Sequence, residues 1–373
     1  MAIERMAASP ARVDSLDVFR GLAVAGMILV STPGTWSAVY PALDHAVWNG
    51  WTPTDLVFPF LLFAMGAAVP LALARRKDAA TPVTRHVLRR AILLVCLGLV
   101  LNAIEATRPL ALDTFRIPGV LQRIAIVYVA VALVTETLGL GGQIAAVAAA
   151  LLVYWAAMTL VPVPGAGAGV LTPAGNLASF VDRRLFGRHM LTADVDPEGL
   201  LSTVPAVATA MLGVFAGTWL RRTEQEARTV WLWVGGVAAT LAGLAWARVF
   251  PINKNLWTSS FALFSAGLAA QCLAVCDWMV GAGGWRQLTR PLAAFGRNAL
   301  AAYVLSVGLD SLLSRLTVAG SSIKSAAFRA TFVPWLRPCC GLEGASLAYA
   351  LAYVALWAVV LMGMHRRGVF VGV

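Results

Sequence analysis

The stretch from Leu43 to Phe60 places side chains that could carry out chemistry directly before a long apolar run. It reads LDHAVWNGWTPTDLVFPF and contains His45, Asp55, two tryptophans and an asparagine. An imidazole titrates near neutral pH, so His45 could act as a general base or as a nucleophile. The alternative is a loop histidine at a membrane interface, beside Trp48 and Trp51 as interfacial aromatic residues.

Asp55 stands where a helix should begin. Thr52 can serve as the N-cap, Pro53 suits the first helical position, and a carboxylate is favoured near the third. His45 lies ten residues earlier, in the preceding loop. If this loop folds back, Asp55 would hold His45 in one tautomer, as the acid of a catalytic triad does. The same carboxylate could instead act only on the helix dipole, and the two roles are compatible.

A second polar cluster lies inside a predicted span. The segment Arg116 to Tyr128 reads RIPGVLQRIAIVY and places Gln122 and Arg123 near the start of the span. An arginine at membrane depth usually faces a polar cavity or a partner. We therefore expect a substrate or phosphate contact here, with a structural ion pair as the alternative.

Two more polar segments precede apolar runs. Asp196 and Glu198 begin DPEGLLSTVPA, where acids fit a helix start as well as they fit a site. The stretch Asn253, Lys254 and Asn255 is too polar to be explained by packing against lipid. Together with the histidine, these groups predict a polar cavity suited to acid–base or acyl-transfer chemistry.

The elements that must position these groups are membrane helices. Of 373 residues, 59% are hydrophobic and 13% charged, and the mean hydropathy is +0.77, which no soluble domain of this length could bury. At about 20 apolar residues per crossing, and without the alternation of barrel strands, the chain is predicted to be all-α and polytopic, with about ten spans in a single domain. The predicted spans are Leu16 to Ser31, Leu56 to Ala74, Val87 to Ile104, Pro118 to Leu138, Ile144 to Val161, Ser202 to Leu220, Val230 to Val249, Leu256 to Cys276, Leu292 to Leu313 and Ala345 to Met364.

Basic residues determine the predicted orientation. In a ten-span chain, the clusters that begin at Arg5, Arg75, Arg221, Arg286 and Arg366 all fall on one side. By the positive-inside rule, both termini are then cytoplasmic and the loops that carry the polar groups lie outside.

Several other classes of protein find no support in the sequence. The net charge of +11 comes from basic membrane flanks, so we expect membrane lipid and no nucleic acid as a partner. The five cysteines predict neither a disulfide framework nor a zinc site, because three fall in apolar runs and two are adjacent. We find no phosphate loop, HExxH or GxSxG motif, and we expect no metal.

Six motifs occur in order over nearly the whole chain: SLDVFRG, LDHAVWNGWTPTDLVFPF, RIPGVLQRIAIVY, DPEGLLSTVPA, NKNLWTSSFAL and FGRNALAAY. Their combination resembles the heparan-alpha-glucosaminide N-acetyltransferase family of transmembrane acyltransferases, in its shorter bacterial form. The resemblance implies a multi-helical, often homodimeric protein of the bacterial inner membrane. It also implies acetyl-CoA as the acyl donor and an amino sugar as the acceptor.

The same resemblance implies site residues. It makes His45 catalytic and Asp55 its acidic partner, whereas Ser31 stands where the family has an asparagine and therefore reaches less far. The bacterial form lacks the lumenal N-terminal extension of the animal protein, which leaves a polysaccharide acceptor unsupported. The candidate substrate- and cofactor-binding residues are Ser31, Trp48, Asn49, Arg116, Gln122, Arg123, Asp196, Glu198, Asn253, Lys254 and Asn255.

Two functions compete on this basis. In the first, His45 takes a proton from an attacking amine or carries the acetyl group, while Arg116, Arg123 and Lys254 hold phosphates or polarise the thioester. In the second, an amino-sugar permease or binding protein uses the same cavity without acyl transfer. The sequence shows no inverted repeat or Gly/Pro-broken helix pair typical of transporters. A scaffold in an envelope complex is a third, weaker interpretation.

Overall fold

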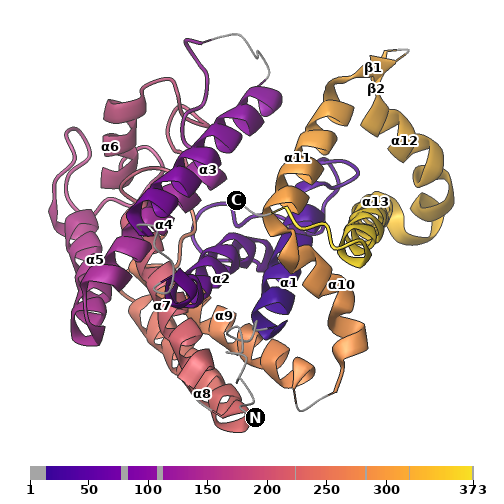
Figure 1. Cartoon of the computed structure of the whole chain (residues 1–373). Coiled ribbons are helices and arrows are strands. Elements are labelled where there is room, and N and C mark those ends of the chain that lie inside the picture. The colour runs from indigo at the N-terminus through magenta and orange to yellow at the C-terminus, as the bar shows by residue number, and fades with distance from the viewer. Residues whose placement is uncertain are drawn as a thin grey trace, which may run out of the picture.

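A computed structural model describes residues 14–76, 83–106, 112–222, 224–281, 284–318 and 320–371, and it is built almost entirely of helices (Figure 1). The predicted all-helical class is confirmed. The helices are α1 Asp14–Ser31, α2 Pro53–Arg76, α3 Val83–Glu105, α4 Val120–Thr137, α5 Leu140–Leu160, α6 Leu177–Phe186, α7 Thr203–Arg222, α8 Gln225–Trp246, α9 Ser259–Val280, α10 Arg286–Arg297, α11 Ala299–Arg315, α12 Ile323–Thr331 and α13 Val333–Arg366, with a 3-10 turn η1 at Pro41–Leu43. Two short strands, β1 Thr317–Val318 and β2 Ser321–Ser322, pair antiparallel before α12.

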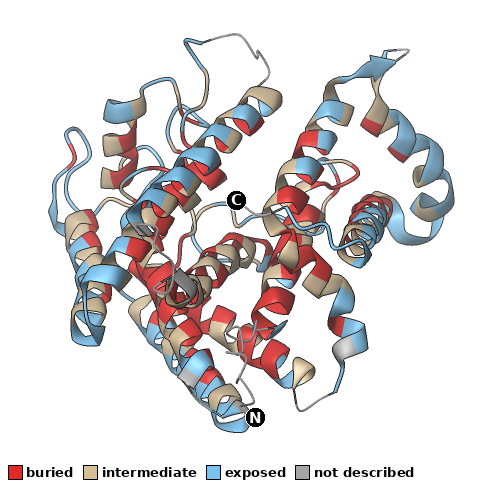
Figure 2. Ribbon diagram, in the orientation of Figure 1, coloured by how far each residue is buried: buried red, intermediate tan, exposed pale blue. Residues whose placement is uncertain are grey.

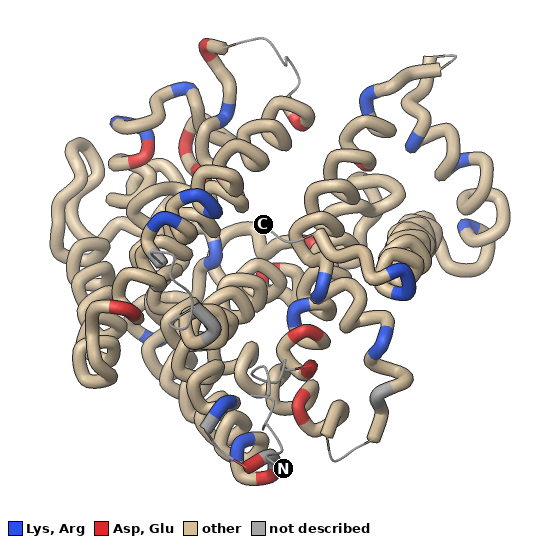
Figure 3. Tube along the Cα trace, in the orientation of Figure 1, with Lys and Arg blue, Asp and Glu red and all other residues tan. Residues whose placement is uncertain are grey.

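Eight of the described helices are long and apolar enough to cross a membrane, and a bent pair makes nine. The eight are α2, α3, α4, α5, α7, α8, α9 and α13. The protein is therefore a multi-pass membrane protein, with fewer candidate spans than the ten expected. The first expected span forms α1, but Asp14, Asp17 and Arg20 put three charges into its 18 residues. Figure 3 shows that most acidic and basic residues lie near helix ends and in connecting segments.

The ninth expected span, Leu292 to Leu313, is not one continuous helix. The chain bends by 75° between α10 and α11, at Asn298. Gly296 directly before the bend packs against α1, where a Cβ would lie 1.8 Å from the backbone oxygen of Asp17. The side chain of Asn298 is held by the C-terminal segment, because the backbone N–H of Val371 donates to its Oδ1 at 2.8 Å. The sequence shows no Gly/Pro-broken helix pair of the kind typical of transporters, and the structure bends this one expected span at Asn298.

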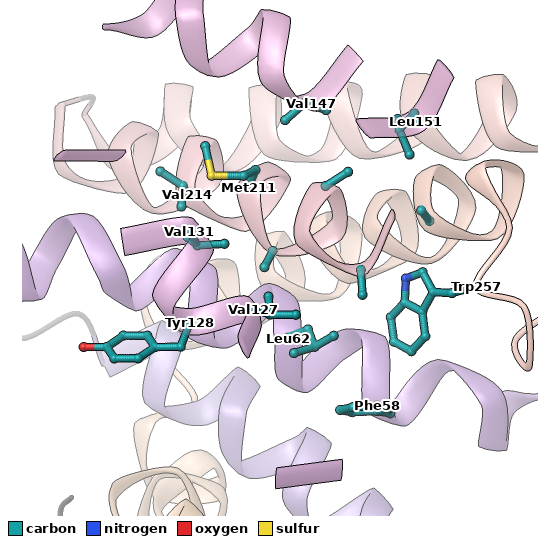
Figure 4. Close-up of a cluster of buried hydrophobic side chains, with 14 of the residues drawn as sticks. Phe58, Leu62, Val127, Tyr128, Val131, Val147, Leu151, Met211, Val214 and Trp257 are labelled. Carbon is teal, nitrogen blue, oxygen red and sulfur yellow. The ribbon is translucent and has the colours of Figure 1, made fainter. Parts of the chain in front are cut away.

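The largest buried cluster joins α2, α4, α5, α7 and α9 (Figure 4). Phe58 on α2 meets the buried indole of Trp257 edge to face, with ring centroids 5.3 Å apart. Figure 2 shows buried residues concentrated on the inner helices, whereas large apolar residues of α5 and α8, such as Val153 and Trp231, stay exposed. An exposed apolar face of this kind suits contact with lipid. The inner helices thus form a rigid support for the loops between them.

Candidate active site

The imidazole of His45 contacts the carboxylate of Asp55. Asp55 occupies the third position of α2, and its Oδ1 lies 2.7 Å from Nδ1 of His45. Its Oδ2 accepts hydrogen bonds from the backbone N–H groups of Ala46 at 3.1 Å and Thr52 at 3.0 Å. The loop thus folds back onto the helix start as expected, and the bond to Thr52 is half of a capping box. The Asp55 side chain is 1% exposed and that of His45 is 52% exposed, so the acid lies behind the histidine.

Lys254 completes a cluster of three ionisable groups. Its Nζ lies 3.1 Å from Nδ1 and 3.3 Å from Nε2 of His45, and 3.8 Å from Oδ1 of Asp55. Burial lowers the pKa of Lys254 by more than the nearby carboxylates of Glu198 and Asp55 raise it. The carboxylate oxygen Oδ1 of Asp55 can only accept a hydrogen bond, so Nδ1 of His45 must carry the proton. In the neutral ring we therefore assign the lone pair to Nε2. A base or nucleophile and a positive donor therefore lie side by side.

Two loops are joined to hold this cluster in place. The Asn253 amide donates to Oδ1 of Asn49 at 3.1 Å, and the N–H of Gly50 donates to the carbonyl of Ile252 at 2.8 Å. Gly50 has φ 102°, a conformation that favours glycine. The indole of Trp48 donates to the carbonyl of Leu171 at 2.8 Å, which ties the histidine loop to a third segment. Trp48, Asn49 and Asn253 are thus placed to position the histidine and the lysine.

The cluster opens into a cavity of about 660 Å³, within the usual size range of small-molecule sites. Six of the residues predicted from the sequence line it: Ser31, His45, Arg116, Glu198, Lys254 and Asn255. The remaining predicted residues do not line it: Trp48, Asn49, Asp55, Gln122, Arg123, Asp196 and Asn253. Among the described residues, no three His, Cys, Asp or Glu side chains are placed to hold a metal ion.

Arg116 is engaged by two acids. Its guanidinium donates to both carboxylate oxygens of Asp196 at 2.9 and 2.7 Å, and to Glu198 at 2.6 Å. Burial would lower the pKa of Arg116, but the bond to Asp196 and the charge of Glu198 raise it overall. Burial likewise would raise the pKa of Asp196, but Arg116 lowers it. The three side chains form an ion-pair network on one cavity wall, which leaves Arg116 few free donors for a phosphate.

Arg123 lies in the protein interior, away from the cavity lining. It is 1% exposed, donates to the carbonyl of Gly199 at 2.8 Å and to Oγ of Ser202 at 2.5 Å, and covers the ring of Trp257 at 5.2 Å. These contacts tie α4 to the segment directly before α7. No described carboxylate forms an ion pair with Arg123, and its contact with a substrate or phosphate stays a prediction. Its neighbour Gln122 donates to the carbonyl of Ile117 at 3.0 Å and likewise braces the start of α4.

Sequence reasoning missed one whole wall of the cavity. Residues of α11 line it at helical spacing: Tyr303, Val307, Asp310, Ser311, Ser314 and Arg315. Asp310 pairs with Lys324 of α12 at 2.8 Å, and both side chains are mostly buried. An acid within a predicted span was the available signal, because ionisable residues at membrane depth are costly and mark functional sites. Glu105 and Trp36 also line the cavity and were not predicted.

His189 is another histidine of the connecting segments, and it is held by backbone contacts. Its Nδ1 lies 2.8 Å from the carbonyl oxygen of Phe115, and its own carbonyl accepts from the N–H of Ile117 at 3.0 Å. It is absent from the lining of the 660 Å³ cavity.

A second cavity of about 300 Å³ lies at the other end of α1 and α3. Arg20 of α1 and Arg90 of α3 line it, together with Arg297 and largely apolar residues. By contrast, the first cavity is lined by Met27, Val30 and Ser31 of α1, by Thr32 directly after it, and by Glu105 of α3. Val120 and Tyr303 line both cavities, so these two side chains form a shared wall.

The fold and this site define a polytopic helical membrane protein that presents a histidine and a lysine to a polar cavity, with an aspartate behind the histidine. The chain is a distant homologue of heparan-alpha-glucosaminide N-acetyltransferase. It is 30% identical to that protein from Homo sapiens over 357 residues, which covers 80% of this chain and 53% of the human protein. It is 29% identical to the protein of the same name from Mus musculus over 315 residues, which covers 69% of this chain and 48% of the mouse protein.

The chain spans about half the length of these curated relatives. Residues 12–135 match the family described as "Domain of unknown function (DUF5009)". This region includes both His45 and Asp55.

Proposed function

We propose that this protein is a membrane-bound acetyltransferase that moves an acetyl group from acetyl-CoA to the amine of an amino sugar. The observation that carries the proposal is the contact of His45 with Asp55 and Lys254 at the edge of a cavity of substrate size. Both homologues are named as N-acetyltransferases, which supports this activity. That shared name also motivates a glucosamine-like acceptor.

The geometry supports a direct reaction. The amine nitrogen of the acceptor attacks the thioester carbonyl, so that a C–N bond forms and the C–S bond breaks. Nε2 of His45 takes the proton of the amine and can pass it to the departing thiolate, while Asp55 stabilises the imidazolium through Nδ1. The ammonium of Lys254 is placed to stabilise the negative charge that develops on the carbonyl oxygen.

A second form of the reaction uses His45 as a nucleophile. Nε2 would first accept the acetyl group from the thioester and release CoA, and the amine would then displace the imidazole. The ammonium of Lys254, whose Nζ lies 3.3 Å from Nε2, would stabilise the developing negative charge in this form as well. Both forms of the reaction therefore use the same three side chains.

The two cavities suggest how a cytosolic donor could meet an external acceptor. The cavity with Arg20, Arg90 and Arg297 has the basic groups that phosphates prefer, and it meets the histidine cavity at Val120 and Tyr303. We propose that acetyl-CoA enters the smaller cavity and that its thioester reaches His45 past this wall. In this arrangement CoA itself never crosses the membrane.

The proposal includes a location and an orientation. Basic clusters at one side of the spans support cytoplasmic termini, with the histidine cavity facing outward from a bacterial inner membrane. We also propose a homodimer, as the family resemblance implies. Cysteine accessibility labelling at the two ends of α3 in intact cells, and light scattering of the purified protein, would test these two points.

The central experiment is an assay of acetyl transfer. Purified protein in detergent is incubated with radiolabelled acetyl-CoA and a panel of amino sugars, and wild type is compared with His45→Ala. We expect acetylated sugar from wild type and a loss of about 100- to 10,000-fold in the variant. Equal rates in both proteins would remove His45 from the mechanism.

An amino-sugar permease is the second candidate, and the break between α10 and α11 favours it. Broken helices often build the substrate sites of transporters. Uptake of labelled glucosamine into proteoliposomes without acetyl-CoA would support the permease. Acetylated product that forms only with acetyl-CoA, and no uptake without it, would exclude it.

A further inference from the structure

Two unassigned residues of the larger cavity, Glu105 and Trp36, have the chemistry of a sugar subsite. We propose that Trp36 stacks on the acceptor's sugar ring and that Glu105 accepts hydrogen bonds from its hydroxyl or amino groups. The inference deepens the proposed function and rests on it for the identity of the acceptor. It names the residues that select the acceptor, separately from those that act on the acetyl group.

Glu105 is a carboxylate held in an unfavourable position. It is the last residue of α3, where the helix dipole disfavours a negative charge, and its exposed side chain lines the cavity. No described residue makes a hydrogen bond or ion pair with it. The nearest basic groups are already engaged, since Arg116 binds Asp196 and Glu198, and Arg315 donates to the carbonyl of Ala106. The Glu105 oxygens are therefore available to a ligand.

Trp36 supplies a flat apolar surface to the same cavity. Its side chain is 63% exposed although it lines the cavity. The loop that carries it is fixed to α13, because the N–H groups of Gly34 and Thr35 donate to the carbonyl oxygen and Oγ of Ser346 at 3.2 and 3.1 Å. An exposed indole on a fixed loop can pack against the C–H face of a sugar at low entropic cost.

These two groups complement each other for one class of ligand. A sugar ring presents an apolar face and an edge of hydroxyl groups, and Trp36 and Glu105 match these two parts. Asp310 and Ser311 on α11 extend the polar wall of the cavity. His45 and Lys254 line the cavity as well, so a sugar bound on Trp36 and Glu105 would share the space with the reacting groups.

Without a role in sugar binding, Trp36 would be a tryptophan of the membrane interface. Glu105 would then be a solvated acid at the end of α3. Each has a matched control in the chain. Trp335 is 78% exposed at the start of α13, and Asp113 is an exposed acid in the segment after α3; neither lines the cavity.

The test measures sugar binding without chemistry. Glucosamine is titrated calorimetrically into the full-length protein in detergent, in the absence of acetyl-CoA. Glu105→Gln and Trp36→Ala should each weaken binding by about tenfold to a hundredfold. Trp335→Ala and Asp113→Asn should bind as wild type does. Trp36→Phe should recover part of the affinity, because a ring face remains.

Kinetics separate the subsite from a general structural role. Glu105→Gln should raise KM for the amino sugar about tenfold or more and leave KM for acetyl-CoA unchanged. The proposal is overturned if both cavity variants bind the sugar as wild type does, or if wild type binds no sugar. Sugar binding that depends on Glu105 without any acetyl transfer would leave the subsite standing and refute the acetyltransferase.

Discussion

Nδ1 of His45 and Oδ1 of Asp55 lie 2.7 Å apart, across a loop that returns to the first turn of α2. The carboxylate is almost fully buried and is also held by two backbone N–H groups. An acid fixed in this way sets both the orientation and the tautomer of the ring. The contact between Asp55 and His45 therefore leads to the first prediction.

Asp55→Asn should lower kcat for acetyl transfer by about 100- to 10,000-fold while the protein stays folded. An asparagine can offer its amide N–H to Nδ1, which would place the ring proton on Nε2 and remove the base. Initial rates with acetyl-CoA and glucosamine measure the effect. Asp44→Asn is the matched control, because the one described hydrogen bond to the Asp44 side chain comes from the backbone N–H of His45, and the bond from Thr52 goes to the Asp44 backbone carbonyl. A variant at position 55 with a rate within twofold of wild type would contradict the proposed role.

Lys254 should produce a basic limb in the pH–rate profile. Its ammonium stabilises the developing oxyanion, so activity should fall as rising pH removes the proton. Because burial lowers the pKa of this lysine, the fall should occur below the ordinary lysine range near about 10.4. Lys254→Met should lose about 100- to 1,000-fold in kcat and should also lose the limb. Lys254→Arg should retain more activity and no limb in the accessible range. An unchanged limb in Lys254→Met would assign it to another group.

Val120→Trp should hinder the donor without affecting the acceptor. Val120 lines both cavities, so a larger side chain there would narrow the route of the thioester. We expect KM for acetyl-CoA to rise about tenfold and glucosamine affinity to stay unchanged. Ile126→Trp on the same helix is the control, because Ile126 is exposed on its outer face. Equal KM values in the two variants would argue against entry through the smaller cavity.

Gly296→Ala should destabilise the protein by about 1–3 kcal/mol or more. An added Cβ would lie 1.8 Å from the backbone oxygen of Asp17, so α10 could not keep its distance from α1. Gly235→Ala is the matched control within α8, where nothing lies within 4 Å of the new Cβ. That substitution should be neutral or stabilise by up to about 1 kcal/mol. Thermal midpoints in detergent compare the two, and equal midpoints would mean that α1 and α10 can separate freely.

Periodicity and composition predicted most of the fold. Nine of the ten expected apolar runs became helices at nearly the expected places, because about 20 apolar residues have few alternatives in lipid. The remaining run, Leu292 to Leu313, broke at Asn298. Its apolar composition continues across the break, and a close backbone contact of Gly296 with a distant helix lies directly before it. Such a contact leaves no periodic signal.

The candidate site was predictable where its groups are close in sequence. The His45 loop and the start of α2 are ten residues apart, and the N-terminal capping pattern fixed the position of Asp55. Contacts between distant segments were not predictable. Lys254 joins His45 across 209 residues, and the α11 wall depends on the unpredicted break. Arg123 was expected at a substrate, but its partners come from the loop before α7.

The wall formed by Val120 and Tyr303 has an electrical consequence. When water fills the cavities on both sides, the voltage across the membrane falls mainly over the thin layer that water does not enter. A unit charge that crosses this layer would gain or lose about 2.3 kcal/mol per 100 mV. A neutral acetyl group crosses this layer without electrical work. Moving the charged phosphates of CoA across it would require such work. The proposed acetyl transfer should therefore proceed at the same rate in an energised membrane and in a depolarised one.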